Sequence, residues 1–427
     1  MTKTEIKKIT YQEKFANICE TTHYADLQLK EKDLSHRLAF DYFFTQQELR
    51  IFCESAIDLR LWGEPDITIW YEKVSQTINQ GSHFKKKLFG LLNDYRSELQ
   101  KQPLVYHNSK KTWPQKEKLN IQVEKTEKKI TGMCPVASSK TVCCNLRTID
   151  AVENCAFSCS YCAIEPFYEK KNIFFDKNFK EKLQQIEIDP NRRYHYGIGQ
   201  SSDSLVWDNK ENILSDLMGF AKINTNILLE FKSKSSKIDF FLENEIPKNV
   251  CISWSLNPQV VIDHEEHYTS SLKSRLNAAR KIANMGIKIS FHFHPIFYFE
   301  GFEAGYLAVI RDIMTNFRPH EILFISMGTL TFARSAVRKI RRDASKSQVL
   351  KMQMIKNPEG KFTYSKEIKD KIFKLVYEGF KPWHDKVFFY LCMEEAKFWE
   401  TLFGDYYKTN DDFEKALLTS SFDKINK

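Results

Sequence analysis

Three cysteines stand close together in the chain at Cys155, Cys159 and Cys162, and Tyr161 directly precedes the last of them. This Cys-x3-Cys-x2-Cys spacing puts three thiolates on one tight loop, which can hold three irons of a [4Fe–4S] cluster. The fourth iron is then open to a ligand that is not protein. An open iron beside an aromatic side chain suits the reductive cleavage of S-adenosylmethionine to a 5′-deoxyadenosyl radical. We therefore predict that the three cysteines hold a cluster and that Tyr161 lies beside the S-adenosylmethionine.

Zinc is the main alternative ligand of these thiols, because cysteine pairs at x2 spacing are common in zinc sites. Zinc usually takes four ligands arranged as two such pairs, and no partner pair follows at zinc-finger distance. Unligated thiols are a second alternative.

The composition is that of a globular protein with a sizeable core. The chain has 427 residues, of which 42% are hydrophobic, and ten cysteines, too few for a disulfide framework in a chain this long. The N-terminus is polar and no run approaches eighteen apolar residues, so we expect a cytoplasmic protein with no membrane segment. The net charge of +9 permits binding to a polyanion without requiring it.

The pattern of apolar residues changes along the chain. Residues 1 to about 105 show helical three and four spacing. A lysine-rich stretch near residues 108–130 then suggests either a solvated linker or a strand or loop that follows a phosphate backbone. From about residue 145, short β-rich runs alternate with amphipathic stretches. The expected strands are 147–152, 194–198, 226–231, 250–256, 288–295 and 321–326. The expected helices are 177–187, 210–222, 236–244, 270–285 and 303–316.

Alternating strands and helices predict parallel strands with crossover helices. Six units fit a partial (β/α)6 barrel of the α/β class, with its chemistry at the carboxyl ends of the strands. We expect three regions: helices and a basic linker at 1–130, the barrel at 131–330, and a C-terminal extension packed on the barrel at 331–427.

Several segments together resemble the spore photoproduct lyase family of radical S-adenosylmethionine enzymes. The resemblance covers roughly residues 130 to 405. Besides the cysteine triplet, the matching segments are Gly199-Gln-Ser-Ser-Asp-Ser204, Leu229-Glu-Phe-Lys-Ser-Lys234, Ser253-Trp-Ser-Leu-Asn-Pro258, His292-Phe-His-Pro-Ile296, Met327-Gly-Thr-Leu330 and Tyr390-Leu-Cys-Met-Glu-Glu395.

The resemblance implies repair of a thymine dimer in duplex DNA, with the damaged bases drawn out of the stack. It also implies an electron donor such as flavodoxin or ferredoxin. Ser202 matches a serine that contacts the methionine part of the cofactor, Lys234 a lysine near its carboxylate, and Ser255 a further serine on the cofactor side. Asp203 and Asn257 fall in the same matching segments and are taken as further cofactor contacts.

Two positions depart from the family pattern. The cysteine that returns hydrogen to the product radical is replaced by Gln200, and a tyrosine that helps relay hydrogen is replaced by Ala163. A different donor would then be needed, and Tyr196 or Cys251 could supply it.

A second group of cysteines lies upstream at Cys134, Cys143 and Cys144. Adjacent cysteines rarely form a structural disulfide with each other, because the geometry is strained. One of these thiols could be the missing hydrogen donor, with Cys144 the first to test. An extra metal site and buried, inert thiols are the alternatives.

Two further features have more than one interpretation. Arg334, Arg338 and Arg341 share one face of an expected helix, which is either a solvated face or a phosphate contact. His292 and His294 share one face of a strand and either line the site or lie in the core.

The leading hypothesis is thus a radical S-adenosylmethionine lyase that repairs DNA. The alternatives are the same cofactor chemistry on RNA or a small molecule, and a non-enzymatic iron–sulfur or zinc protein that binds nucleic acid.

Overall fold

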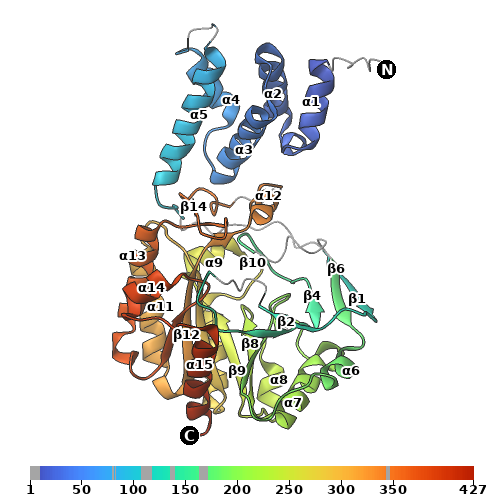
Figure 1. Cartoon of the computed structure of the whole chain (residues 1–427), viewed down its shortest axis with the longest axis vertical. Helices are drawn as coiled ribbons and strands as arrows, with labels where there is room; N and C mark the ends of the chain where they lie inside the picture. The colour runs from blue at the N-terminus through green and yellow to red at the C-terminus, as the bar shows by residue number, and fades with distance from the viewer. Residues whose placement is uncertain are drawn as a thin grey trace, which may run out of the picture. The chain divides into compact units, whose positions relative to one another are not determined.

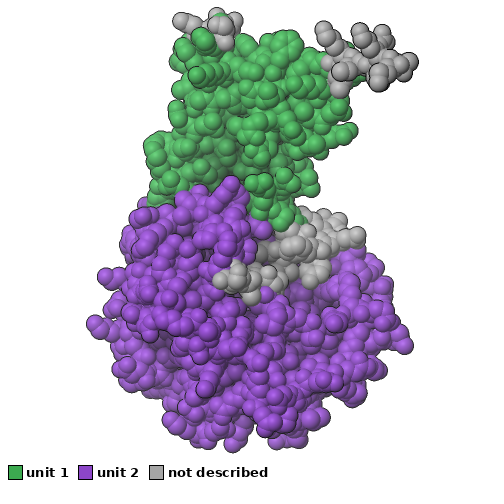
Figure 2. All heavy atoms as spheres, viewed as in Figure 1, with its two compact units in different colours: residues 1–104, 334–353 green, residues 105–333, 354–427 purple. Residues whose placement is uncertain are grey.

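The computed structural model describes residues 10–78, 81, 83–106, 118–134, 140–162, 172–342 and 347–427 (Figure 1). The chain divides into two compact units (Figure 2): residues 1–104 with 334–353, and residues 105–333 with 354–427. The sequence had suggested one boundary near residue 130 and a C-terminal extension that begins at residue 331. In the structure the basic segment at 334–353 belongs instead to the unit of the N-terminal helices.

The first unit is helical, as its apolar spacing predicted. Its helices are α1 (Tyr11–Glu20), α2 (Leu29–Tyr42), α3 (Gln46–Trp62), α4 (Ile67–Ser75), α5 (Phe84–Lys101) and α12 (Arg334–Arg342), with a short 3₁₀ turn η1 (Tyr24–Asp26). Thr45 caps α3 through a capping box with Glu48. The buried face of α3, which includes Leu49, Phe52 and Ile57, lies at the centre of this unit's core.

Helix α12 is joined to α3 by buried charges. The Arg341 guanidinium donates to both carboxylate oxygens of Asp58 over 2.8 and 2.9 Å, and it lies 3.1 Å from Glu54. Arg96 donates to the same Asp58 carboxylate. Because Arg341 is paired with these carboxylates, it is not available for the phosphate contact considered from the sequence. Arg334 and Arg338 are exposed.

Replacing Asp58 with asparagine should lower the free energy of unfolding of this unit. The substitution keeps the shape but removes the buried charge that pairs with two partly buried guanidinium groups, and we expect a loss of about 1–3 kcal/mol. Urea titration of the full chain measures the loss, with Asp33→Asn at an exposed position of α2 as the control, which should stay within about 0.5 kcal/mol of the wild type. Equal stability of the two variants would show that the charge of Asp58 does not stabilise this unit.

The second unit contains an eight-stranded sheet in the order β16-β12-β11-β9-β8-β7-β3-β2. Its parallel strands are β3 (Arg147–Ile149), β7 (Tyr194–Ile198), β8 (Ile227–Ser233), β9 (Val250–Ser255), β11 (Lys288–Ile296), β12 (Ile322–Thr329) and β16 (Phe388–Leu391). Strand β2 (Thr131–Met133) adds antiparallel to β3 at the edge. Strand β12 is buried along its whole length, as is typical of a parallel sheet covered on both faces. The predicted partial α/β barrel is confirmed.

Five of the helices of this unit overlap the predicted crossover helices. The helices of the unit are α6 (Phe179–Gln184), α7 (Ile213–Ile223), α8 (Asp239–Glu243), α9 (Gln259–Glu265), α10 (Leu272–Asn284), α11 (Phe302–Asn316), α13 (Lys366–Gly379), α14 (Ala396–Phe403) and α15 (Asn410–Ile425), with 3₁₀ turns η3 (Lys210–Asn212), η4 (Pro319–Glu321) and η5 (Lys381–Trp383). Helices α9, α13, α14 and α15 lie outside the predicted helix ranges. None of the helices in the described part of the chain is both long and apolar enough to cross a bilayer.

One strand prediction was wrong, and one parallel strand of the large sheet was not predicted. The expected strand 147–152 ends at Ile149, and Val152 starts β4 (Val152–Glu153) in a separate sheet. That sheet also contains β1 (Asn120–Glu124) and β6 (Asn172–Asp176), so part of the lysine-rich linker is a strand. Strand β16, which extends the sheet beyond the six predicted strands, lies in the segment assigned to a C-terminal extension. The remaining short strands are β5 (Ser158–Cys159), β10 (Glu266–His267), β13 (Thr331–Phe332), β14 (Ile355–Lys356) and β15 (Phe362–Thr363).

Candidate functional site

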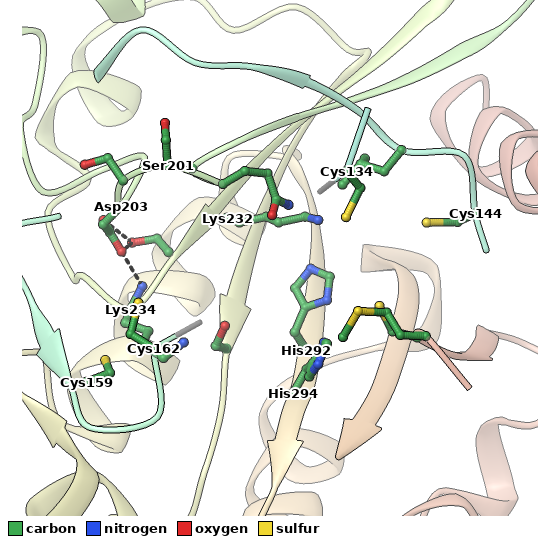
Figure 3. A pocket seen from close by; sticks show the side chains of 18 of the residues that line it. Cys134, Cys144, Cys159, Cys162, Ser201, Asp203, Lys232, Lys234, His292 and His294 are labelled. Atoms are coloured by element: carbon green, nitrogen blue, oxygen red, sulfur yellow. Dashed lines mark hydrogen bonds between the residues drawn. The ribbon is translucent and has the colours of Figure 1, made fainter. Parts of the chain in front are cut away.

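A cavity in the second unit opens at the carboxyl ends of the parallel strands (Figure 3). Its lining combines the cysteine triplet with polar side chains from the ends of several strands. They are Cys155, Cys159, Cys162, Tyr161, Ser202, Asp203, Lys232, Lys234, Ser255, His292 and His294, together with Cys134, Cys143, Cys144 and Cys392. The cavity therefore brings most of the predicted site residues together.

The cysteine loop is fixed at both ends by backbone contacts. Asn154 takes a left-handed conformation at φ 71°, and its side chain accepts a hydrogen bond of 2.8 Å from the amide of Cys155. The loop then pairs antiparallel with β10, with Cys159 opposite Glu266. The amide of Cys162 donates to the carbonyl of Cys159 over 3.0 Å, which closes a tight turn.

This loop has the donor chemistry that an iron–sulfur cluster needs. Burial raises the pKa of Cys155 to about 12, so a bound metal would have to displace thiol protons. In the described part of the chain, no three cysteine, histidine or carboxylate side chains stand at metal-ligand spacing. The fit to a cluster rests on three cysteines that belong to one loop and line one cavity.

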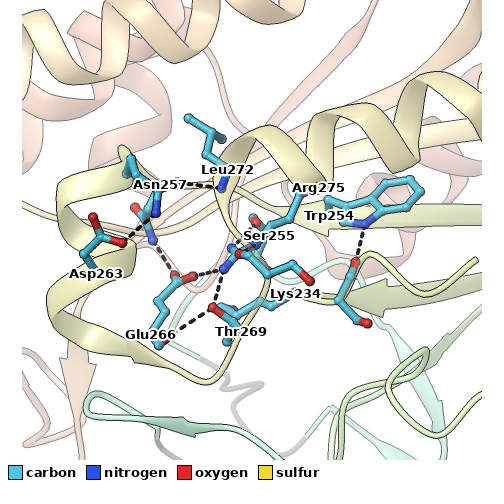
Figure 4. Close-up of polar contacts among 12 residues, drawn as sticks. Lys234, Trp254, Ser255, Asn257, Asp263, Glu266, Thr269, Leu272 and Arg275 are labelled. Atoms are coloured by element: carbon cyan, nitrogen blue, oxygen red, sulfur yellow. Dashed lines mark hydrogen bonds and ion pairs between the residues drawn. The ribbon is translucent and has the colours of Figure 1, made fainter. Parts of the chain in front are cut away.

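A buried network of polar contacts is centred on Glu266 and Arg275 (Figure 4). The Tyr161 hydroxyl donates to Glu266 over 2.6 Å, and Glu266 forms an ion pair of 2.6 Å with Arg275. Burial alone would raise the pKa of the Glu266 carboxyl, but Arg275 and then Lys234 hold it below its usual value. Arg275 also donates to the carbonyl of Ser255, so one charged pair positions the cysteine loop and the end of β9 together.

The segment after β7 makes a tight turn into the cavity. Gly199 has φ 93°, and a Cβ there would lie 2.7 Å from the carbonyl oxygen of Lys232, so only glycine fits. Ser202 accepts a hydrogen bond of 2.9 Å from Trp207. Asp203 accepts from the amide of Lys234 over 2.7 Å, which ties this turn to β8. Burial raises the pKa of the Asp203 carboxyl despite these donors.

The predicted cofactor contacts separate into two groups. Lys234 and Ser255 line the cavity, and the Lys234 ammonium lies 5.8 Å from the centre of the Tyr161 ring. Asn257 lies behind the cavity wall, where it donates to Glu266 over 2.8 Å and accepts from Tyr306 over 2.7 Å. Asn257 is thus placed to orient Glu266 rather than to touch a ligand.

The predicted hydrogen donors also separate. Cys143 and Cys144 line the cavity, as does Gln200. Tyr196 is buried outside the cavity lining, where its ring contacts Phe220 of α7, so its position argues against a role as donor. Cys251 lies 3.3 Å from Ser290 in the core, also outside the lining. Ala163 lies outside the described residues.

Sequence reasoning missed a buried charge network on β8. Glu230 is fully buried, and its carboxylate lies 2.9 Å from His195 Nε2 and 2.6 Å from His292 Nε2. Lys232, two residues along the strand, has its ammonium 3.7 Å from the same carboxylate. Alternate residues of a strand lie on the same face. The alternating charges of Glu230, Lys232 and Lys234 were therefore the sequence signal for this network.

His294 should make the protein less stable in acid. Burial lowers its pKa to about 3, so the folded state keeps it neutral while the unfolded chain takes up a proton below about pH 6.5. Stability therefore falls as the pH drops below 6.5, by about 2 kcal/mol between pH 7.5 and pH 5. Urea titrations at the two pH values should show this difference shrinking in His294→Asn and persisting in His320→Asn, an exposed control.

Comparison with known proteins identifies spore photoproduct lyases as relatives of this chain. A family model described as "Spore photoproduct lyase" matches residues 106–385. The chain is 26% identical over 170 residues to the spore photoproduct lyase of Geobacillus sp. (strain Y412MC61), a match that covers 39% of this chain and half of that protein. It is 25% identical over 227 residues to the Clostridium acetobutylicum enzyme, covering 52% of this chain and 67% of that one.

Solved structures show the same fold. A spore photoproduct lyase complexed with dinucleoside spore photoproduct matches with a TM-score of 0.55 at 20% identity, over 64% of this chain and 82% of that one. A variant with bound AdoMet and the same dinucleoside matches with a TM-score of 0.53 at 21% identity, over 64% and 81%. At these identities the similarity establishes the architecture.

Proposed function

Because the chain belongs to the spore photoproduct lyase family of radical S-adenosylmethionine lyases, we propose that it cleaves a covalent cross-link between neighbouring bases of damaged DNA. The observation that carries this proposal is the shared cavity. It places three thiols of one loop beside Ser202, Lys234 and Ser255, which suit the polar tail of an amino acid. A structural cluster would need no such side chains.

Each group of residues then has a definite task. Cys155, Cys159 and Cys162 would hold a [4Fe–4S] cluster, which supplies the electron that cleaves S-adenosylmethionine into methionine and a 5′-deoxyadenosyl radical. The Lys234 ammonium would pair with the carboxylate of the cofactor. Tyr161 lines the cavity and donates its hydroxyl to Glu266, and its ring would lie beside the bound cofactor.

Damaged duplex DNA is the proposed substrate. Two of the similar solved structures contain dinucleoside spore photoproduct, and the net charge of +9 favours a polyanion. A base cross-link must leave the stack to enter a cavity of this kind, and a lesion that already distorts the helix lowers that cost. The reaction also requires a one-electron donor such as flavodoxin or ferredoxin. The proposed compartment is the cytoplasm, where thiols are kept reduced.

Anaerobic reconstitution with iron and sulfide tests the proposal. The reduced protein should convert S-adenosylmethionine to 5′-deoxyadenosine and repair an oligonucleotide that carries spore photoproduct. A variant with alanine at Cys155, Cys159 and Cys162 should do neither. Formation of 5′-deoxyadenosine without repair, or with equal turnover of irradiated RNA, would refute DNA repair and leave the cofactor chemistry in place. A loaded protein that makes no 5′-deoxyadenosine with any substrate would refute the enzyme.

A further inference from the structure

The cavity has a second group of thiols opposite the cysteine loop. Cys134 follows β2, Cys143 and Cys144 precede β3, and Cys392 follows β16, and all four line the same cavity. These segments are far apart in the chain. Gln200 lines the cavity as well, at the position where the family pattern has a hydrogen donor, and a glutamine side chain has no S–H bond to give.

Backbone hydrogen bonds hold the thiol-bearing segments together. The amide of Cys134 donates to the carbonyl of Leu146 over 2.9 Å, and the amide of Val142 donates to the carbonyl of Glu394 over 3.0 Å. The amide of Cys143 donates to the side chain of Asn410 over 2.9 Å. The group is therefore built into the fold by contacts among three parts of the chain.

Lys232 brings a positive charge to this group. Its side chain extends from β8 toward Cys134 and His292 (Figure 3). Burial would lower the pKa of Lys232, but the Glu230 carboxylate raises it, so Lys232 stays an ammonium ion. An ammonium ion beside these thiols favours a thiolate and opposes a metal cation in the same place.

The two adjacent cysteines differ in protonation. A hydrogen bond from Cys144 lowers the pKa of Cys143 to about 7, against the effect of burial. The same hydrogen bond, followed by burial, raises the pKa of Cys144 well above its usual value. Near neutral pH, Cys143 is therefore partly ionised to the thiolate, whereas Cys144 keeps its S–H bond.

We infer that Cys144 is the hydrogen-atom donor that replaces the cysteine absent at position 200, with Cys143 and Lys232 as positioning residues. This inference rests on the proposed function, which supplies the substrate radical. The S–H bond of Cys144 breaks homolytically and its hydrogen atom forms a C–H bond at the substrate carbon, which leaves a thiyl radical. The Cys143 thiolate shares the unpaired electron through a sulfur–sulfur contact. One electron from the ferredoxin- or flavodoxin-class donor and one proton then restore the pair.

Deuterium transfer tests the donor. In D2O the Cys144 thiol exchanges, so repair by the wild-type enzyme should place one solvent deuterium in the methyl group of the released thymine. Cys144→Ala should keep 5′-deoxyadenosine formation within about twofold and lose repair and deuterium transfer by at least about tenfold. Cys251→Ala, which removes a buried thiol outside the cavity, should match the wild type. Undiminished repair and labelling by Cys144→Ala would overturn the inference.

A second measurement does not depend on repair. Iodoacetamide pulses at several pH values, followed by peptide mass spectrometry, should show Cys143 reacting with a midpoint near pH 7, as its lowered pKa implies. Lys232→Met should raise that midpoint by about one pH unit. A midpoint at or above the ordinary thiol value of about 8.5 would overturn the inference whatever the outcome of the repair assay. So would iron or zinc that remains when Cys155, Cys159 and Cys162 are alanine and disappears with Cys144→Ala.

Discussion

Replacing Glu266 with alanine is expected to lower the free energy of unfolding by about 3–5 kcal/mol and to abolish 5′-deoxyadenosine formation. Glu266 and Arg275 are both fully enclosed, and their ion pair spans 2.6 Å. Removing the carboxylate leaves the Arg275 charge buried with only neutral partners, which is the costly case. It also frees the Tyr161 hydroxyl and removes a side chain opposite Cys159. Urea titration of the cluster-free protein measures the first effect, and iron content with cofactor turnover measures the second.

An exposed ion pair provides the matched control for this variant. Glu303 lies 2.8 Å from Lys371, and both side chains are about half exposed. Glu303→Ala should therefore change stability by less than about 1 kcal/mol and leave turnover intact. The double variant Glu266→Leu with Arg275→Met should recover much of the stability, because no charge is left buried, and still fail to turn over cofactor. Recovery of turnover in the double variant would show that the pair stabilises the fold without positioning the loop.

The sequence predicted the fold best where the pattern of apolar residues extends over a long segment. Strands β7 and β9 and helices α10 and α11 lie close to their predicted ranges, since buried parallel strands and amphipathic helices leave clear patterns. Strand β16 has only four residues and follows helical segments, so nothing local marked it as part of the sheet. The segment at 334–342 is a helix as its spacing suggested, but its partner, Asp58, lies 283 positions away in the sequence, and no local pattern encodes such a contact.

The site was predictable where spacing alone determines geometry. Three cysteines within one turn must lie together, and residues that follow parallel strands must meet at one end of the sheet. The network of Glu266 and Asn257 depends on side-chain directions that a single sequence does not show. Asn257 illustrates the limit, because its segment was identified correctly while its side chain points to Glu266 behind the cavity wall.

Glu230→Gln should also lower the free energy of unfolding strongly, because this one carboxylate interacts with several cationic and hydrogen-bond-donating side chains. Its carboxylate lies within hydrogen-bond distance of His195 and His292 and 3.7 Å from the Lys232 ammonium. Burial would raise the pKa of Glu230, but Lys232 and then His292 hold it well below its usual value. We expect a loss of about 3–5 kcal/mol at pH 7.5, since an amide cannot balance the buried Lys232 charge.

The pH dependence of this loss of stability shows whether the negative charge of Glu230, rather than the shape of its side chain, causes the effect. A depressed carboxyl pKa gives stability that is present above the unfolded value of about 4.3 and is lost as the pH falls below it toward the folded pKa. The difference between wild type and Glu230→Gln should therefore be constant from pH 7.5 to about 5 and shrink below about 4. The same variant removes negative charge near Lys232, so the iodoacetamide midpoint of Cys143 should move to lower pH. An unchanged midpoint would mean that Lys232 and Glu230 do not influence the thiol pair, and Lys232 would then lose its place as a positioning residue.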